Sequence, residues 1–175
     1  MAIDVGAPCI DGGFPLSAAN TLIEETNPAN ATGTINTVCV WAETSLSGIE
    51  YAAFTNQGGN VFSTNGDTNG SNLNATNQTI HTAAGNDFTA FAITAGDYIG
   101  LYYSGGAIGS TYSSNLWRVA TNDEIPCTNT TFTYSSGWGA LSLYGTGEEG
   151  GAPSTYEKEG FVIMHLYKMM EGYQE

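Results

Sequence analysis

The sequence predicts an all-β protein, built as an antiparallel β-sandwich of two sheets. The 175 residues include ten Tyr, seven Phe and three Trp, which favour pleated surfaces. Lys and Arg together number only three, so helices would lack the long charged side chains that their exposed faces normally carry. Short β-branched and aromatic runs alternate with clusters of Gly, Asn and Pro, as is typical of sandwiches. The length fits one domain, since about 100 to 200 residues per domain is usual.

The first clear strand covers residues 34–43, where every second residue from Ile35 to Trp41 is expected to face the same side. A second apolar run follows at residues 48–55, directly after the sequence Ser-Leu-Ser-Gly. Because that sequence is rich in turn-forming residues, the two runs together predict a β-hairpin.

Residues 56–77 are dominated by Asn, Gly, Ser and Thr, with Val61, Phe62 and Leu73 as apolar anchors. This composition predicts a long surface loop. Beyond it, strands are expected at residues 79–82, 88–93, 97–104, 108–119, 131–134 and 138–144. Roughly eight or nine strands result, which is enough for two packed sheets.

The strand pattern breaks off at residues 145–153, which are mostly Gly, Ala, Pro and Glu. This segment predicts a linker or a long turn. The sandwich is therefore expected to span residues 1–147. Residues 148–175 are expected to be a Gly-rich linker followed by an apolar C-terminal strand.

Residues 161–170 (FVIMHLYKMM) form the most apolar decamer of the chain, interrupted by His165 and Lys168. A strand that is apolar on both faces needs cover on both faces. It can be a last strand of its own sandwich, a short helix packed on the sheet, a disordered tail, or a strand that adds to a neighbouring molecule. In the last case the assembly contacts would be Phe161, Val162, Ile163, Met164, Leu166, Tyr167, Met169 and Met170.

Seventeen acidic residues against three basic ones exclude a nucleic-acid partner, because such affinity depends on Lys and Arg neutralising phosphates. Anionic membranes are disfavoured for the same reason. No run approaches the roughly 18 to 20 apolar residues of a membrane span, so membrane insertion is not expected. The first residues lack the basic and apolar regions of a signal peptide. Either a leader has been removed or none is used, and the initial methionine favours the second.

Cys9, Cys39 and Cys127 lie too far apart for a zinc knuckle. Two states stay open: one disulfide with a leftover thiol, or three reduced cysteines that pack as small hydrophobes. If the chain folds in a cytoplasm, the reduced state is favoured.

Catalytic motifs are sparse, and no enzymatic activity is expected. His81 and His165, the only histidines, belong to no H-E-x-x-H or H-x-H pair that would hold a catalytic metal. The sequence contains neither a G-x-S-x-G elbow nor a G-x-x-x-x-G-K-[ST] phosphate loop. Seventeen acids make a glycosidase-like carboxylate pair inevitable somewhere, so such a pair indicates nothing. His81 is expected to be a partly exposed residue of a strand.

Calcium is the one metal that the composition favours, because hard cations prefer clustered carboxylate and amide oxygens. The candidate ligands are Asp67, Asn65 and Asn69, within the sequence NGDTNGSN. This loop lacks the closing glutamate of an EF-hand, so an ordinary turn-rich loop is the favoured alternative. No other cofactor is expected.

Five short segments occur together in this chain. They are residues 3–8 (IDVGAP), 27–33 (NPANATG), 95–100 (AGDYIG), 125–132 (IPCTNTTF) and 141–147 (LSLYGTG). In this combination the chain resembles the jelly-roll modules that recur in predicted tailed-phage virion and metagenomic viral structural proteins. The resemblance covers about residues 3–147. It implies a jelly-roll-like sandwich that decorates or builds a particle, and it implies no catalytic residues.

A jelly roll also suggests glycan binding, since such folds often hold sugars against aromatic faces. The rings available are those of Tyr102, Tyr103, Tyr112, Trp117, Tyr134 and Trp138. Packing within the core or on a sheet face is their favoured alternative role. Trp138, Tyr112 and Trp117 are the candidate glycan contacts.

These observations predict a non-enzymatic structural protein of a phage-like virion, either a capsid decoration, a cement protein or a tail or appendage component. It would self-assemble as a homo-oligomer, or with other virion proteins, through sandwich surfaces and terminal strands. The first alternative is an extracellular filament or surface-layer subunit joined by strand addition, with calcium as a bridge. The second is a glycan-binding module. The expected location is the virion, or alternatively the extracellular space.

Overall fold

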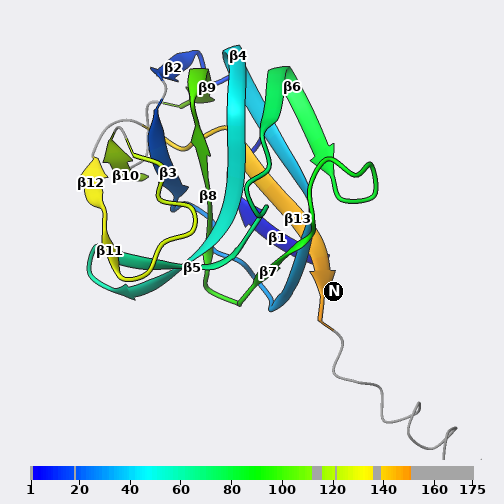
Figure 1. Cartoon of the computed structure of the whole chain (residues 1–175), viewed down its shortest axis with the longest axis vertical. Coiled ribbons are helices and arrows are strands. Elements are labelled where there is room, and N and C mark those ends of the chain that lie inside the picture. Colours follow the sequence, from blue (N-terminus) through cyan, green and yellow to red (C-terminus); the bar gives the residue numbers. More distant parts are fainter. Residues whose placement is uncertain (1, 18, 112–115, 121, 136–138, 151–175) are drawn as a thin grey trace, which may run out of the picture.

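The computed structural model describes residues 2–17, 19–111, 116–120, 122–135 and 139–150. These residues form strands and loops without a helix, which confirms the all-β class (Figure 1). The strands are β1 (Ala2–Gly6), β2 (Phe14–Ser17), β3 (Asn20–Glu24), β4 (Gly33–Gly58), β5 (Val61–Asp67), β6 (Leu73–Thr82), β7 (Phe91–Ile93), β8 (Tyr98–Tyr103), β9 (Gly105–Ser110), β10 (Leu116–Ala120), β11 (Thr130–Thr131), β12 (Thr133–Ser135) and β13 (Leu143–Glu149).

The strands form two antiparallel sheets that share the long strand β4. In the first sheet, the N-terminal half of β4 lies between β13 and β6, and β1 pairs with the far side of β13. The β2–β9 pair and β7 also join this half. In the second sheet the order is β12-β10-β3-β8-β4-β5-β11. Figure 1 shows β3, β10 and β12 to the left of β4, and β6 and β13 to its right.

The predicted hairpin at residues 34–55 is wrong, because β4 continues through Ser-Leu-Ser-Gly without turning back. Residues 33–42 pair with β13 and β6, whereas residues 50–58 pair with β8 and β5. Leu46 is 2% exposed and Ile49 is fully buried, so the middle of this segment belongs to the core. Gly48 has a φ of 61°, which glycine adopts at little cost and which bends the strand from one sheet into the other.

The predicted alternation from Ile35 to Trp41 is also interrupted. Thr37 pairs with Thr146 but Ile35 pairs with Gly147, so Asn36 is the extra residue of a β-bulge. Ile35 therefore points into the core with Val38 and Val40, while Thr37, Cys39 and Trp41 lie on the half-exposed outer face.

The predicted surface loop at residues 56–77 is largely two strands, β5 and the first part of β6. Their polar side chains reflect positions near sheet edges, where one face of a strand meets solvent. Phe62 is fully buried, whereas Asn69 and Gly70 form the exposed turn between the strands. The predicted strand at residues 108–119 is divided into β9 and β10, and β1 to β3 were not predicted.

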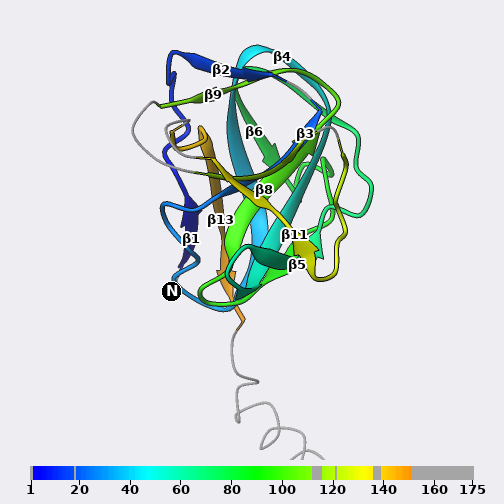
Figure 2. The ribbon, with the colours of Figure 1, turned by 90° about the vertical axis from the view of Figure 1, so that its left-hand side faces the viewer.

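The predicted linker beginning at residue 145 is also wrong, because β13 extends to Glu149 between β1 and β4 (Figure 2). Its glycines are required by close packing. A Cβ on Gly145 would lie 2.7 Å from Ile99 Cδ1, and one on Gly147 would lie 1.9 Å from the Thr34 carbonyl oxygen. Glycine in a strand often marks such a close approach.

Two hydrophobic cores form because β3 and the second half of β4 are buried on both faces. Leu22 and Ala53 belong to the large core between the sheets, which also includes Ile3, Val5, Ile35, Tyr51, Ile99, Tyr103 and Leu143. The neighbouring residues Ile23 and Ala52 point the opposite way, since side chains alternate along a strand. They form a second core with Phe54, Phe62, Ile125, Cys127 and Phe132, beneath the segment before β12.

Candidate functional site

The sheet edges are the first surfaces to consider for a protein predicted to assemble by strand addition. The outer edge of β1 is covered by its own chain. Gly6 N donates to Asn27 O at 2.8 Å, Asn30 N donates to Asp4 O at 3.3 Å, and Asp4 N donates to Asn30 Oδ1 at 3.0 Å. The segment at residues 27–30 thus occupies this edge and leaves little backbone for another strand.

The edge strand β2 is four residues long and contains Pro15, which has no N–H to donate. Short edge strands and proline on an edge are common protections against unwanted pairing. This edge is therefore poorly suited to accept a further strand.

The edge strand β6 is different, because it is ten residues long and has no charged residue, proline or glycine. It pairs with β4, and no described strand pairs with its other side. Ile80 on this strand is 60% exposed, the most exposed of the large apolar side chains that the structure describes. Nothing in the local sequence marks Ile80 as a contact residue, because its exposure depends on the position of β6 at an edge of the sheet.

The hydrogen bonds of Thr82, the last residue of β6, show which backbone groups of this strand point away from β4. Thr82 N donates to Asp87 Oδ2 at 2.8 Å, and Asp87 N donates to Thr82 O at 3.2 Å, so the Thr82 backbone faces away from β4. Backbone groups alternate in direction along an antiparallel strand. The N–H and C=O groups of Ile80 and Gln78 therefore face the open side as well.

The predicted assembly residues Phe161, Val162, Ile163, Met164, Leu166, Tyr167, Met169 and Met170 lie outside the described residues. The same holds for two of the candidate glycan contacts, Tyr112 and Trp138.

The candidate calcium ligands lie in and directly after β5. Asp67 Oδ1 accepts from Asn69 N at 2.6 Å, and Asn69 has a φ of 55°. Asn65 Nδ2 donates to Asp97 Oδ2 at 2.6 Å and to Thr94 Oγ1 at 2.9 Å. Among the described residues, no group of three or more His, Cys, Asp or Glu is arranged to hold a metal ion. Calcium binding through Asp67, Asn65 and Asn69 stays a prediction.

The third candidate glycan contact, Trp117, lies on β10 and is half-buried. Its ring centroid lies 5.3 Å from that of Phe62 and 4.6 Å from that of Tyr134. Tyr134 is 47% exposed on β12. Trp117 therefore has a packing role on Phe62 and also contacts an exposed aromatic ring.

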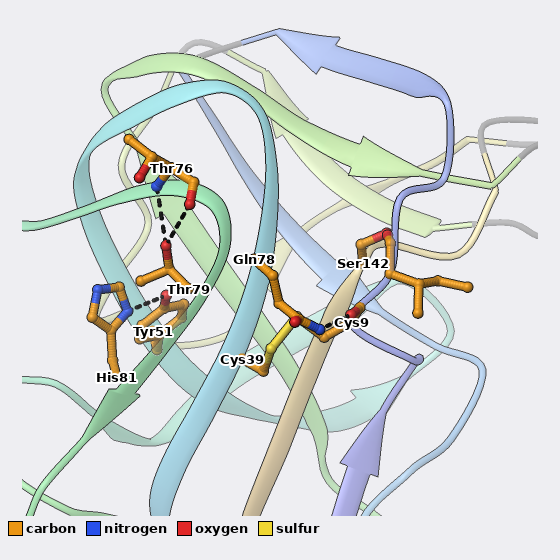
Figure 3. Close-up of a disulfide and its surroundings, with 9 residues drawn as sticks. Cys9, Cys39, Tyr51, Thr76, Gln78, Thr79, His81 and Ser142 are labelled. Atoms are coloured by element: carbon orange, nitrogen blue, oxygen red, sulfur yellow. Dashed lines mark hydrogen bonds between the residues drawn. A yellow bond between two sulfur atoms is a disulfide. The ribbon is translucent and has the colours of Figure 1, made fainter.

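The favoured expectation of three reduced cysteines is wrong: Cys9 and Cys39 form a disulfide, and Cys127 is a buried free thiol. Figure 3 shows the disulfide on the outer face of the first sheet, with Gln78 beside it. Gln78 Nε2 donates to Cys9 O at 2.7 Å, and Ser142 Oγ donates to Ile10 O at 2.6 Å. The segment around Cys9 is thus fastened across the sheet, which brings together cysteines 30 positions apart.

His81 is buried, at 6% exposed, rather than partly exposed as predicted. Its Nδ1 lies 2.9 Å from Tyr51 Oη (Figure 3). Its Nε2 lies 3.1 Å from Asn74 O. A carbonyl can only accept, so Nε2 carries the proton and Nδ1 accepts from the Tyr51 hydroxyl. Burial raises the pKa of Tyr51, which keeps this hydroxyl protonated. Both histidine nitrogens are engaged, and the Tyr51–His81 pair links β4 to β6.

Glu24, at the end of β3, is a fully buried carboxyl group. It accepts hydrogen bonds from Thr26 N at 2.8 Å, from the Thr26 hydroxyl and from Leu141 N. Burial raises the pKa of Glu24, and the hydrogen bonds from Thr26 and Leu141 oppose the rise. This residue joins the second sheet to the segment that precedes β13.

We expect the free energy of unfolding to fall as the pH rises from about 4.5 through the raised pKa of Glu24. In that range the unfolded chain has released a proton that the folded chain still binds, so the folded state loses relative stability. Urea unfolding between pH 4.5 and 7.5 measures this dependence. Glu24→Gln should flatten it while lowering stability at every pH, because an amide NH₂ would face a backbone donor. Glu148→Gln, exposed on β13, is the control, and an unchanged slope in Glu24→Gln would contradict the assignment.

Comparison of the chain with protein-family models, curated proteins and solved structures finds no match. The described residues include no helix that is long and apolar enough to cross a membrane.

Proposed function

We propose that this chain is a non-enzymatic structural protein of a phage-like virion, acting as a decoration, cement or tail or appendage component. In this proposal the C-terminal segment at residues 161–170 of one copy adds as a strand to β6 of another copy. The observation that carries the proposal is the edge of β6, a ten-residue strand without charged residues, where no described strand pairs with the outward backbone of Gln78 and Ile80 and where the Ile80 side chain is exposed. The resemblance of five segments to phage virion modules supports the choice of particle.

The last described strand of the sandwich is already paired on both sides. This supports a role for the C-terminal segment in contacts between molecules. The described core cluster between the sheets runs from Ile3 to Leu143. Its last strand, β13, already has β1 on one side and β4 on the other. In this proposal the apolar segment at residues 161–170, which follows β13 in the sequence, supplies a strand in trans.

The physical basis of the proposed contact is β-augmentation, in which ladder hydrogen bonds provide affinity and alternate side chains provide register. The open edge offers the outward backbone groups of Gln78 and Ile80, and Ile80 also offers apolar surface. The incoming segment is apolar on both faces. Burial of each large apolar side chain contributes about 1.5 to 3 kcal/mol before the loss of conformational freedom is subtracted.

We expect the purified full-length chain to form oligomers in light scattering and negative-stain microscopy, and a chain ending at Gly150 to be a folded monomer. The deletion begins at residue 151 because Glu148 and Glu149 belong to β13. An 18.3 kDa monomer for the full-length chain at every concentration would contradict self-assembly. Unfolding of the shortened chain would contradict it too, since the segment would then belong to its own sandwich.

Ile80→Pro tests the receiving edge, because it removes an outward N–H and leaves the bonds between β6 and β4 in place. We expect at least a tenfold weaker association, equivalent to about 1.4 kcal/mol. Ile80→Ala is the matched control: it keeps the N–H and loses only apolar area, so it should weaken association less. Circular dichroism of both variants in the shortened chain establishes that they fold. Equal association of Ile80→Pro and the unmutated chain would exclude β6 as the receiving edge.

A second candidate is an extracellular filament or surface-layer subunit joined by the same strand addition. The disulfide between Cys9 and Cys39 favours it, because disulfides persist in oxidising compartments. Microscopy separates the two candidates, since a filament subunit polymerises alone whereas a decoration protein forms closed oligomers or binds a particle. Calcium bridging through Asp67 would appear as polymers that dissolve when a chelator is added.

A further inference from the structure

Three residues form an aromatic corner at the edge of the second sheet: Glu25, Trp117 and Tyr134. Trp117 and Tyr134 are direct partners across the β10–β12 pair, which lies on the left of Figure 1. Glu25 directly follows β3, the strand on the other side of β10. Three segments that are far apart in the sequence thus contribute one side chain each.

The two rings are held by contacts on their inner side. Trp117 packs on the fully buried Phe62, with ring centroids 5.3 Å apart. Tyr134 contacts Trp117 at a tilt of 59° and remains 47% exposed. An exposed aromatic ring is therefore supported from beneath by a second ring and a core side chain, which limits its freedom before any ligand binds.

Glu25 orients the polar ends of both rings. The Tyr134 hydroxyl donates to Glu25 Oε1 at 3.2 Å, and the Trp117 side chain also hydrogen bonds to Glu25. Partial burial raises the pKa of Glu25, and these two hydrogen bonds oppose the rise. A carboxylate has about four acceptor positions, so Glu25 retains capacity to accept from a ligand hydroxyl.

We propose that the aromatic corner is a binding site for a neutral carbohydrate. One sugar face stacks on the exposed ring of Tyr134, where the negative face of the ring attracts C–H groups. Sugar hydroxyls donate to Glu25 beside the ring. A preorganised ring with an adjacent acceptor suits a ligand that presents an apolar face with hydroxyls at its rim.

Charge and geometry restrict the class of ligand. The net charge of −14 and the carboxylate at the corner repel anionic sugars and other polyanions. An ammonium group held by an aromatic cage needs space between the rings, but the Trp117 and Tyr134 centroids are 4.6 Å apart, so the rings touch each other. A neutral sugar needs no space between the rings and can stack on the exposed part of Tyr134, so it fits better.

This inference extends the proposed function, because a particle component with such a site would attach to glycans. A single shallow site binds weakly, whereas many copies on one particle gain avidity. The site is independent of the assembly contact, since β6 belongs to the first sheet and the corner belongs to the second. Failure of assembly would thus leave the carbohydrate site intact, and each proposal can be tested alone.

The test uses the full chain and five neutral hexasaccharides, of α- and β-linked glucose, mannose, xylose and N-acetylglucosamine. Polygalacturonate and choline serve as anionic and cationic probes. Binding is followed by tryptophan fluorescence and by calorimetry. We expect at least one neutral hexasaccharide to bind, and neither charged probe to do so. No binding of any neutral probe at 10 mM, on the order of −2.7 kcal/mol, would overturn the proposal, as would tighter binding of a charged probe.

Variants locate the site. Tyr134→Ala should weaken binding at least tenfold, while Tyr134→Phe keeps the ring face and should retain most of the affinity. Glu25→Gln should weaken binding because a neutral amide is the poorer acceptor. The matched control is Phe14→Ala, because Phe14 is 49% exposed on β2 in the first sheet. Equal loss in Phe14→Ala and Tyr134→Ala, with both variants folded by circular dichroism, would overturn the assignment to this corner.

Discussion

Replacing both disulfide cysteines, in Cys9→Ala/Cys39→Ala, is expected to lower the free energy of unfolding by about 3 to 4 kcal/mol. The bond links residues 30 positions apart, and closing a loop of that length restricts the unfolded chain by an amount of this size. It also fastens the segment that carries the bonds from Gln78 and Ser142. Such a loss is a large part of the roughly 5 to 15 kcal/mol that stabilises a typical domain.

Urea unfolding of the unmutated chain and of the double variant, each with and without reductant, measures this contribution. Reductant should destabilise the unmutated chain and leave the double variant unchanged. Cys127→Ser is the control, since that thiol is unpaired and its variant should keep the sensitivity to reductant. Thiol titration of the unfolded, unreduced chain should count one thiol. A count of three, with no effect of reductant, would contradict the disulfide.

Gly147→Ala is expected to destabilise the sandwich by about 3 kcal/mol or more. The new Cβ would lie 1.9 Å from the Thr34 carbonyl oxygen and 2.9 Å from Ile35 Cα. Both are backbone atoms, so β13 and β4 would have to separate at the bulge. Overpacking typically costs about 1 to 3 kcal/mol, and each ladder hydrogen bond lost adds about 0.5 to 1.5 kcal/mol.

Gly150→Ala is the matched control, three residues further along the chain. Its Cβ would meet Gly33 Cα at 3.6 Å and Thr32 O at 3.8 Å, which are ordinary contacts. We expect its stability to stay within about 0.5 kcal/mol of the unmutated chain. Thermal and urea unfolding of the two variants give the comparison. Similar stability of Gly147→Ala and Gly150→Ala would show that β13 does not pack on β4 at residue 147 as described.

The errors at β4 and β13 share one physical cause. Ser-Leu-Ser-Gly has the composition of a turn, and the glycines after Tyr144 have that of a linker. Local propensity favours both interpretations, but burial of Leu46 and the close approach of Gly147 to Thr34 decide otherwise. Contacts that determine a β-strand come from distant parts of the chain, so local composition cannot reveal them.

The proposed binding surfaces also depend on contacts that local composition does not reveal. Trp117 and Tyr134 were recognisable as available aromatic rings, yet nothing in the sequence indicated that Glu25 would lie beside them. Their meeting depends on the register between β3, β10 and β12. The exposure of Ile80 likewise depends on β6 lying at an edge, which follows from sheet order rather than from its own residues.

Composition by itself determined that this protein is an acidic, all-β chain. Abundant aromatic residues and scarce cations favour strands over helices wherever each residue lies. Only the tertiary structure decided that β4 joins both sheets, that Cys9 meets Cys39, and that Glu25 meets two aromatic rings. The reason is that composition biases secondary structure whatever the order of the residues. These contacts instead depend on which distant segments become neighbours when the sheets form.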